Sequence, residues 1–251
     1  MKPVLVEIGG FAIYSYGVML SLALLVCSLG LLKQASREKF NPDHVLEAVI
    51  AAALAGLVGS RLLYVFLNWG LYQGQWIKIL FTRSGGLSFY GAFIGGLIAI
   101  LAWCRYRKLD FLKLTDLMAP YLALGYAFGR IGCFLNGCCY GKVSTVPWAL
   151  PASAVDNLLR HPAQLYASLV GLIIFLILYQ LRPRRPFDGF QLIMLALLYG
   201  VLRFITEFFR DMPLVGLNFT LAQIFSLAVV LLSLILLLIF FAIKGYRKGR
   251  V

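Results

Sequence analysis

Long apolar runs separated by short polar segments form the main pattern of this chain. About 20 apolar residues in helical form are needed to cross roughly 30 Å of hydrocarbon. The pattern therefore predicts seven membrane-spanning helices, over residues 13–32, 45–67, 87–104, 114–134, 163–181, 189–208 and 219–243. The first run follows only Lys2 and Glu7, which favours a retained span over a cleavable signal peptide.

Two of the connections differ from the short polar links. Residues 68–86 contain several aromatic side chains and two cations, a composition typical of short interfacial helices that lie along a membrane. Residues 138–161 contain two prolines and a tryptophan and are too few for a separate soluble domain. We therefore expect one transmembrane domain over residues 1–251, with residues 138–161 forming a small cap on its outer side.

Composition supports a membrane class. Hydrophobic residues make up 61% of the chain and charged residues only 13%, whereas soluble domains are about half apolar and a quarter charged. The mean hydropathy of +0.88 agrees with this assignment. The sequence thus predicts an all-α polytopic membrane protein.

The positive charge is distributed unevenly along the chain. The net charge is +13, and 14 of the 23 Lys and Arg residues lie in the connections after the first, third, fifth and seventh runs. Connections rich in Lys and Arg face the cytoplasm, so the N-terminus is expected outside and the C-terminus in the cytoplasm. The charge is explained by topology and by attraction to anionic lipids, and we expect no nucleic-acid partner.

Five charged residues lie well inside the predicted spans, Arg61, Asp116, Arg130, Arg203 and Glu207, and Glu47 lies nearer the end of its span. Each costs about 2.5 kcal/mol or more at the centre of a membrane helix, so each is a candidate functional residue. The three arginines lie in the outer halves of their spans and would repel one another unless an anion sits among them. Phosphate matches guanidinium geometry. Alternatively, Arg203 pairs with Glu207 four residues on, and Arg61 extends to the membrane surface.

Glycines recur at spacings of three to five residues in 56–61, 84–96 and 125–132. Small residues at such spacings allow membrane helices to approach closely. Glycines that end helices near the outer face would also expose backbone N–H groups, which bind anions. The sequence leaves both interpretations open.

Three of the five cysteines, Cys133, Cys138 and Cys139, lie within seven residues. Their C-x4-C-C spacing matches none of the usual zinc patterns, and neither histidine is nearby, so we expect no metal. Packing as small apolar side chains is the favoured interpretation. A disulfide on an oxidising outer side is the alternative.

Seven segments of the chain carry distinctive motifs: "YSYGVML" (14–20), "GSRLLYV" (59–65), "GGLSFYGAFIGG" (85–96), "DLMAPYLALGYAFGRIGCFLNG" (116–137), "HPAQLY" (161–166), "YGVLRFITEFFR" (199–210) and "AQIFSL" (222–227). Together they resemble the prolipoprotein diacylglyceryl transferases of bacterial inner membranes over nearly the whole chain. The combination of GRIG-x-F-x-NG with a downstream YG-x-x-R-x-x-x-E-x-x-R is highly specific.

The resemblance implies an enzyme that transfers the diacylglyceryl group of phosphatidylglycerol to the lipobox cysteine of preprolipoproteins. A thioether forms, glycerol 1-phosphate leaves, and this is the first step of lipoprotein maturation. The implied partners are phosphatidylglycerol, signal peptides with a lipobox cysteine and membrane lipids, without a cofactor. The active site would face the outer leaflet of the inner membrane.

The resemblance and the charge argument together give the candidate site. The candidate catalytic residues are Arg130, Arg203, Glu207 and Tyr90. The candidate substrate-binding residues are Tyr16, Arg61, Asn136, Gly141, His161, Gln164 and Arg210. Asp116 matches another recurring polar position and is expected to be structural. We expect Arg130 and Arg203 to hold the phosphate and Glu207 to orient Arg203.

The proton acceptor for the substrate thiol stays open. Many family members have a histidine where this chain has Tyr90, and a phenol with a pKa near 10 is a poor base unless a cation lowers it. His161 and a water molecule are the other candidates. A histidine before a proline more often caps the following helix, so capping is the favoured role of His161.

The chain departs from the family at further positions. Cys133 and Cys138 replace an asparagine and an acid of many members, Ala167 replaces another acid, and the segment 138–161 is short. Two other functions are therefore considered: a divergent paralogue with the same phospholipid pocket and a different acceptor, and a non-catalytic phospholipid carrier.

Overall fold

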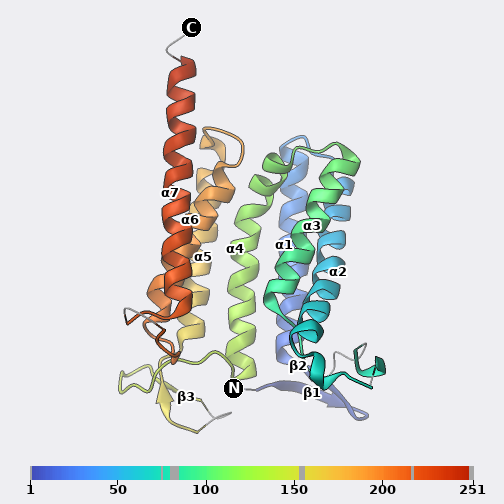
Figure 1. Cartoon of the computed structure of the whole chain (residues 1–251), viewed down its shortest axis with the longest axis vertical. Coiled ribbons are helices and arrows are strands. Elements are labelled where there is room, and N and C mark those ends of the chain that lie inside the picture. Colours follow the sequence, from blue (N-terminus) through green and yellow to red (C-terminus); the bar gives the residue numbers. More distant parts are fainter. Residues whose placement is uncertain (1, 75, 80–84, 153–155, 216–217, 249–251) are drawn as a thin grey trace. The chain divides into compact units, whose positions relative to one another are not determined.

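A computed structural model describes residues 2–74, 76–79, 85–152, 156–215 and 218–248. Seven long helices dominate these residues (Figure 1): α1 (Ser15–Arg37), α2 (Pro42–Leu67), α3 (Phe89–Arg107), α4 (Phe111–Asn136), α5 (Ala163–Leu181), α6 (Phe190–Glu207) and α7 (Leu221–Lys248). Each predicted run coincides with one of these helices to within a few residues. A short 3-10 helix, η3 (Arg182–Arg184), follows α5.

Within the described residues, all of these long helices except α4 are apolar enough to cross a membrane. Helix α4 is 26 residues long, but it contains Asp116, Pro120 and Arg130, which lower its hydropathy. The predicted polytopic membrane protein is confirmed at this level. The polar residues concentrated in α4 are the reason that it differs from the other long helices.

A short hairpin that the sequence analysis did not predict precedes the helices at the N-terminus. Strands β1 (Val4–Ile8) and β2 (Phe11–Tyr14) form an antiparallel hairpin. The two residues between them, Gly9 and Gly10, have φ values of +55° and +80°. A two-residue hairpin turn with both φ angles positive matches the right-handed twist of the strands, and glycine adopts it without strain. Two short apolar segments rich in β-branched and aromatic residues on either side of the glycine pair are the sequence signal for this hairpin.

The segment 68–86 contains short helices, as predicted. Its described residues form two 3-10 helices, η1 (Trp69–Leu71) and η2 (Trp76–Ile79). Gly74 lies between them with φ of +74°, a conformation that interrupts a regular helix. Residues 75 and 80–84 lie outside the described residues.

The predicted cap contains two more short strands. Strand β3 (Leu150–Pro151) pairs antiparallel with β4 (Leu159–Arg160). Isolated bridges join Gly141 to Arg210 and Val143 to Arg160. The cap is therefore tied by backbone hydrogen bonds to the residues that follow α6.

The chain divides into two compact units, Leu32–Leu114 and a larger one of Met1–Leu31 with Thr115–Val251. In the smaller unit, α2 packs against α3 through glycines. A Cβ atom added to Gly59 would lie 2.5 Å from the carbonyl oxygen of Gly91 and 3.2 Å from Cα of Gly95. The helix-packing interpretation of these glycines is thus confirmed. A single domain over residues 1–251 stays a prediction.

The larger unit has its apolar core between α4, α5 and α6, around Ala123, Ile174, Leu178 and Leu202. Helix α1 packs on α4, where the Tyr121 hydroxyl donates a hydrogen bond to the Gly30 carbonyl oxygen at 2.8 Å. At the other end of these two helices, a Cβ atom added to Gly132 of α4 would lie 3.0 Å from the Tyr16 ring of α1, next to the polar residues described below.

Candidate functional site

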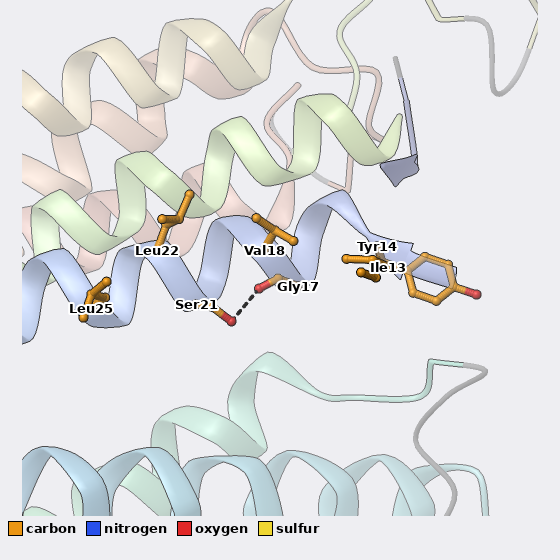
Figure 2. A pocket seen from close by; sticks show the side chains of 7 residues that line it. All are labelled: Ile13, Tyr14, Gly17, Val18, Ser21, Leu22 and Leu25. Carbon is orange, nitrogen blue, oxygen red and sulfur yellow. Dashed lines mark hydrogen bonds between the residues drawn. The ribbon is translucent and has the colours of Figure 1, made fainter. Parts of the chain in front are cut away.

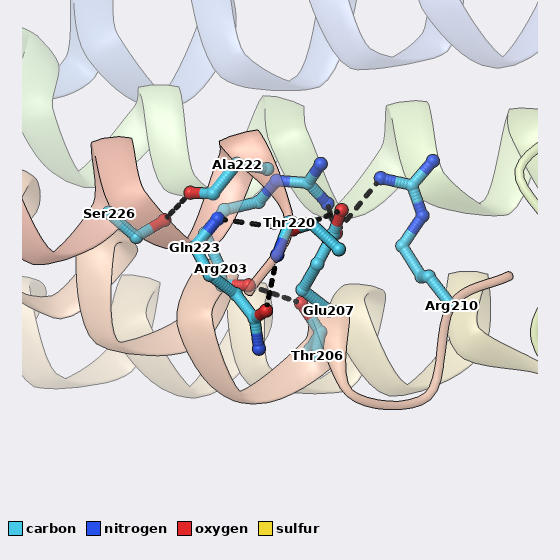
Figure 3. Close-up of polar contacts among 8 residues, drawn as sticks. All are labelled: Arg203, Thr206, Glu207, Arg210, Thr220, Ala222, Gln223 and Ser226. Carbon is cyan, nitrogen blue, oxygen red and sulfur yellow. Dashed lines mark hydrogen bonds and ion pairs between the residues drawn. The ribbon is translucent and has the colours of Figure 1, made fainter. Parts of the chain in front are cut away.

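A buried carboxylate, Glu207, lies at the centre of the polar residues of the larger unit. It is in the last turn of α6, and its side chain is 0% exposed. Arg203, one turn earlier, places Nη1 2.7 Å from Oε2, and Arg210, just beyond the helix, places Nη1 3.2 Å from the same oxygen. The hydroxyl of Thr220 donates to Oε1 at 3.2 Å (Figure 3). One carboxylate thus bridges two guanidinium groups.

The start of α7 fixes the Thr220 hydroxyl. Oε1 of Gln223 accepts a hydrogen bond from the Thr220 backbone N–H at 2.9 Å, and the Thr220 hydroxyl oxygen accepts from the Gln223 N–H at 3.3 Å (Figure 3). This reciprocal arrangement is a capping box, which satisfies backbone donors at a helix start. The cap of α7 therefore also positions a donor for the carboxylate on α6.

Arg130 on α4 supplies a third cation. Its guanidinium carbon lies 4.8 Å from the ring centroid of Tyr126, whose ring meets Tyr199 of α6 edge to face at 5.3 Å. Arg203 lies within electrostatic range of Arg130 as well as Arg210. Here Arg130, Arg203, Arg210 and Glu207 are called the arginine cluster.

The arginine cluster carries excess positive charge. Three guanidinium groups and one carboxylate give a formal net charge of +2, and Glu207 is the carboxylate that pairs with these arginines within the described chain. Like charges in a poorly hydrated environment repel strongly unless an anion is present. The arrangement is therefore suited to bind an anion.

Three thiols form a second group beside the arginines. The Sγ atoms of Cys133, Cys138 and Cys139 all lie within 4.8 Å of one another. After α4 ends, Gly137 at φ +77° and Cys139 at φ +60° turn the chain back on itself. The Cys138 N–H donates to the Cys133 carbonyl oxygen at 3.1 Å. These three residues are called the cysteine cluster below.

The cysteine cluster is in an electropositive environment. The pKa of the Cys139 thiol is lowered, first by hydrogen bonds from the other two thiols and then by the charges of Arg210 and Arg130. Tyr16 on α1 lies within electrostatic range of all three cysteines. Its ring packs on Gly132, where an added Cβ would lie 3.0 Å from the ring.

Gly141 joins the cap to the end of α6. Its N–H donates to the His161 carbonyl oxygen at 3.1 Å, and the next N–H in the chain donates to the Phe209 carbonyl oxygen at 2.9 Å. A Cβ atom at Gly141 would lie 2.5 Å and 2.6 Å from those two oxygens. Glycine is therefore required here for close backbone contact, and this contact fixes the backbone next to Arg210.

Arg160 is a buried cation that the sequence analysis did not single out. It pairs with Asp156 at 2.5 Å and with Asp211 at 3.0 Å, and it donates to the Gly141 carbonyl oxygen at 3.2 Å. The hydrogen bond from Arg160 lowers the pKa of Asp156. The i, i+4 spacing of Asp156 and Arg160 is the sequence signal that could have identified this pair.

Comparisons with known proteins match this chain to one family. A family model described as "Prolipoprotein diacylglyceryl transferase" matches residues 3–239. The chain is 34% identical to "Phosphatidylglycerol--prolipoprotein diacylglyceryl transferase" of Clostridium tetani (strain Massachusetts / E88), covering 99% of this chain and 100% of the relative. The protein of that name from Chlorobaculum tepidum (strain ATCC 49652 / DSM 12025 / NBRC 103806 / TLS) is 37% identical, covering 89% and 84%.

The chain belongs to the prolipoprotein diacylglyceryl transferase family. The resemblance noted in the motifs is therefore confirmed. The candidate residues that the transferase motifs identified fall mostly in the larger unit: Tyr16, Arg130, Asn136, Gly141, His161, Gln164, Arg203, Glu207 and Arg210.

Arg61, a candidate substrate-binding residue, donates its hydrogen bonds to backbone carbonyl groups in the structure. It belongs to the smaller unit and is 8% exposed. Its guanidinium donates to the carbonyl oxygens of Lys78 and Ile79 at 2.7 Å each, and to those of Gly85 and Gly86 at 3.1 and 2.9 Å. It is buried and does not extend to the surface; its hydrogen bonds join Lys78, Ile79, Gly85 and Gly86 to the end of α2. The geometry thus favours a structural Arg61.

Tyr90, the expected acid or base, lies in the first turn of α3 in the smaller unit. Its side chain is 67% exposed, and its ring meets Phe89 edge to face at 5.9 Å. It is therefore not needed to pack this unit. A catalytic role for Tyr90 stays a prediction.

The expected helix cap at His161 is wrong. Helix α5 has Pro162 as its N-cap residue, without a side-chain cap hydrogen bond. The His161 ring contacts the Tyr166 hydroxyl instead, with Nδ1 at 3.2 Å. That hydroxyl also accepts from Trp148 Nε1 at 2.6 Å. The ring is thus part of an aromatic contact between the cap and α5.

The remaining polar candidates have local partners. Gln164 Nε2 donates to the Cys138 carbonyl oxygen at 2.7 Å and so holds the turn of the cysteine cluster. Asn136 is the last residue of α4 and lies beside the Cys138 thiol. Asp116 is fully buried and accepts the N–H groups of Gly189 and Leu192 at 2.8 and 3.1 Å, at the start of α6. Its structural role is confirmed.

An apolar groove runs along β2 and α1 of the larger unit (Figure 2). Its volume is about 480 Å³, and it is lined by Ile13, Tyr14, Gly17, Val18, Ser21, Leu22 and Leu25. The Ser21 hydroxyl donates to the Gly17 carbonyl oxygen at 3.0 Å, so the groove presents little free polarity. Tyr16, beside the cysteine cluster, comes from the same turn of α1.

Proposed function

We propose that this protein transfers the diacylglyceryl group of phosphatidylglycerol to the lipobox cysteine thiol of preprolipoproteins. The observation that carries the proposal is the arginine cluster, which has a net charge of +2 in a chain of this family. A phospholipid supplies the anion that such a cluster needs.

The reaction makes one bond and breaks one bond. The acceptor thiol loses its proton, its sulfur forms a C–S bond to the glyceryl carbon that carries the phosphate, and the C–O bond to that phosphate breaks. Glycerol 1-phosphate leaves with the bonding electrons. A thiol with a pKa near 8.5 must become a thiolate to react, and Tyr90, His161 and a water molecule are the candidate proton acceptors.

The arginine cluster would stabilise the charge that develops on the leaving phosphate. Arg130 and Arg203 hold the headgroup phosphate, while Glu207 keeps Arg203 and Arg210 in place through its two ion pairs. Fixed cations in a water-poor site stabilise charge without the reorganisation that water requires, an effect of several kcal/mol. The groove along α1 has an apolar lining suited to an acyl chain.

The same proposal includes the finer topology. Seven spans, an N-terminus outside and a cytoplasmic C-terminus follow from the distribution of Lys and Arg. The arginine cluster and the cap then face the outer leaflet of a bacterial inner membrane. Reporter fusions at Arg37 and at the C-terminus would test this arrangement, and an outside location for either would contradict it.

The decisive experiment incubates purified protein with labelled phosphatidylglycerol and a lipobox peptide. The proposal expects labelled thioether on the peptide cysteine. Arg130→Gln and Arg203→Gln should abolish transfer while the proteins stay folded, whereas Lys33→Gln, which removes an exposed charge on α1, should leave it unchanged. Lipid movement without thioether, product on another acceptor, or full activity in both arginine variants would overturn the proposal.

A further inference from the structure

The cysteine cluster is a feature that the transfer reaction does not use. Its three Sγ atoms lie mutually within 4.8 Å, although a disulfide would require only two of them. Tetrahedral or trigonal coordination by thiolates, with metal–sulfur bonds of about 2.3 Å, needs sulfurs a little under 4 Å apart. Small side-chain rotations would bring the three sulfurs to such a spacing.

We propose that Cys133, Cys138 and Cys139 bind one thiophilic d10 metal ion, Zn²⁺ or Cu⁺, as a trithiolate site. Thiolate ligands select these ions over hard cations such as Mg²⁺ and Ca²⁺. Three metal–sulfur bonds form as three thiol protons pass to the buffer. With Zn²⁺, a water molecule completes the four ligands.

The C-x4-C-C spacing predicted no metal because it matches none of the usual zinc patterns, but spacing alone does not show how the backbone turns. Here the chain leaves α4 at Gly137 and turns through a left-handed Cys139. This turn brings Cys139 back toward Cys133, so that the two thiols lie close together although they are six residues apart in sequence. Gln164 holds the turn by its 2.7 Å bond to the Cys138 carbonyl oxygen, so the ligands are organised before an ion arrives.

The neighbouring charges suit such a site. Three thiolates give a charge of −1 with Zn²⁺ and −2 with Cu⁺, and both complexes are anionic. Arg130 and Arg210 lie within electrostatic range of Cys139 and would stabilise either complex. The site would otherwise be a poor place for a cation.

The metal site would be linked to the lipid site through these shared arginines. An anionic metal complex would neutralise part of the positive charge of the arginines that bind the phosphate. Bound metal should therefore weaken phospholipid binding, and bound phospholipid should weaken metal binding. This linkage rests on the proposed function. Metal binding itself does not, and the test below measures it without any lipid or transfer reaction.

The test uses full-length protein in detergent, reduced, freed of metal by a chelator, and titrated with Cd²⁺ as a spectroscopic probe for thiolate ligands. We expect one Cd²⁺ per chain with a thiolate-to-metal charge-transfer band, displaced by Zn²⁺ or Cu⁺ according to which ion is favoured. Each of Cys133→Ser, Cys138→Ser and Cys139→Ser should weaken binding at least tenfold. Cys27→Ser and Cys104→Ser, which change the other two cysteines, should not.

A second measurement avoids the risk that a variant fails to fold. In the unaltered protein, bound Cd²⁺ should protect residues 133, 138 and 139 from maleimide, while the reactivity of Cys27 stays the same. No band and no protection in the reduced protein would overturn the proposal. A stable disulfide among the three cysteines in protein extracted without reductant, with the mass lower by two hydrogens, would also overturn it.

Discussion

The Glu207→Gln substitution tests the arginine cluster most directly. Glutamine keeps the shape of the side chain and removes the charge. The buried Arg203 and Arg210 then lose the carboxylate that both of them contact. A matched control exists in Glu47→Gln, because Glu47 pairs with Arg107 at a similar 2.8 Å but with side chains 38% and 32% exposed.

The two pairs differ in burial and therefore in expected cost. At an effective dielectric of 20, the attraction at 2.7 Å is about 6 kcal/mol before desolvation is subtracted. Removing one partner of a buried pair costs about 3–5 kcal/mol, because the other charge stays buried without compensation. An exposed pair such as that of Glu47 is worth about 0–1 kcal/mol. We therefore expect Glu207→Gln to be more destabilising by several kcal/mol.

Thermal unfolding in detergent measures this difference. About 2–4 °C is lost per kcal/mol in a domain of this size, so the Tm of Glu207→Gln should fall by roughly 6–20 °C and that of Glu47→Gln by only a few degrees. Inorganic phosphate should raise the Tm of Glu207→Gln more than that of the unaltered protein, because the cluster charge rises from +2 to +3. Equal Tm losses in the two variants, or no difference in the phosphate effect, would refute this reasoning.

Three further predictions concern other parts of the molecule. Gly95→Ala should lower the free energy of unfolding by about 1–3 kcal/mol, because its Cβ would overlap a backbone carbonyl of α2. In the control Gly96→Ala the Cβ has an ordinary contact distance, so this change should be neutral or stabilising by up to about 1 kcal/mol. The Tm values of the two variants measure the difference. Asp116→Asn should cost about 1.5–3 kcal/mol by weakening two charge-assisted bonds at the start of α6, again measured by Tm. Because Arg160 lowers the pKa of Asp156 in the folded state, its contribution is present above about pH 4 and lost as pH falls through the lowered pKa. The Tm difference between Asp156→Asn and the unaltered protein should therefore shrink in acid, and a difference independent of pH would contradict the assignment.

The helices were predictable from sequence because hydropathy alone determines which segments avoid water. The same reasoning missed the hairpin at Gly9 and Gly10, whose strands are too short to give a strong apolar signal. It indicated short helices in residues 68–86 but not that they are of the 3-10 type. A run of aromatic residues indicates an interface, but Gly74 and the carbonyl ligands of Arg61 determine the local backbone.

The candidate site was predictable in its residue types and less so in its pairings. Charges in apolar helices are costly, so Arg130, Arg203 and Glu207 could be recognised individually. The bridging position of Glu207 depends on Arg210 returning toward α6, which Gly141 makes possible through close backbone contact. The gathering of three thiols depends on a left-handed residue at 139. Pairings of this kind depend on backbone turns that residue spacing does not reveal.

The charge of the arginine cluster also bears on the direction of the proposed chemistry. The phosphate of phosphatidylglycerol is a diester with one negative charge, whereas the departing glycerol phosphate gains a second charge as the C–O bond breaks. A site with three arginines and one buried carboxylate has a net charge of +2, which compensates the departing group more fully than the substrate. Such a site binds the transition state more tightly than the ground state, which is the condition for an increase in kcat. Under the proposed function, a charge of +3 without Glu207 would also hold the product more strongly, so the carboxylate would both orient the arginines and favour release of glycerol phosphate.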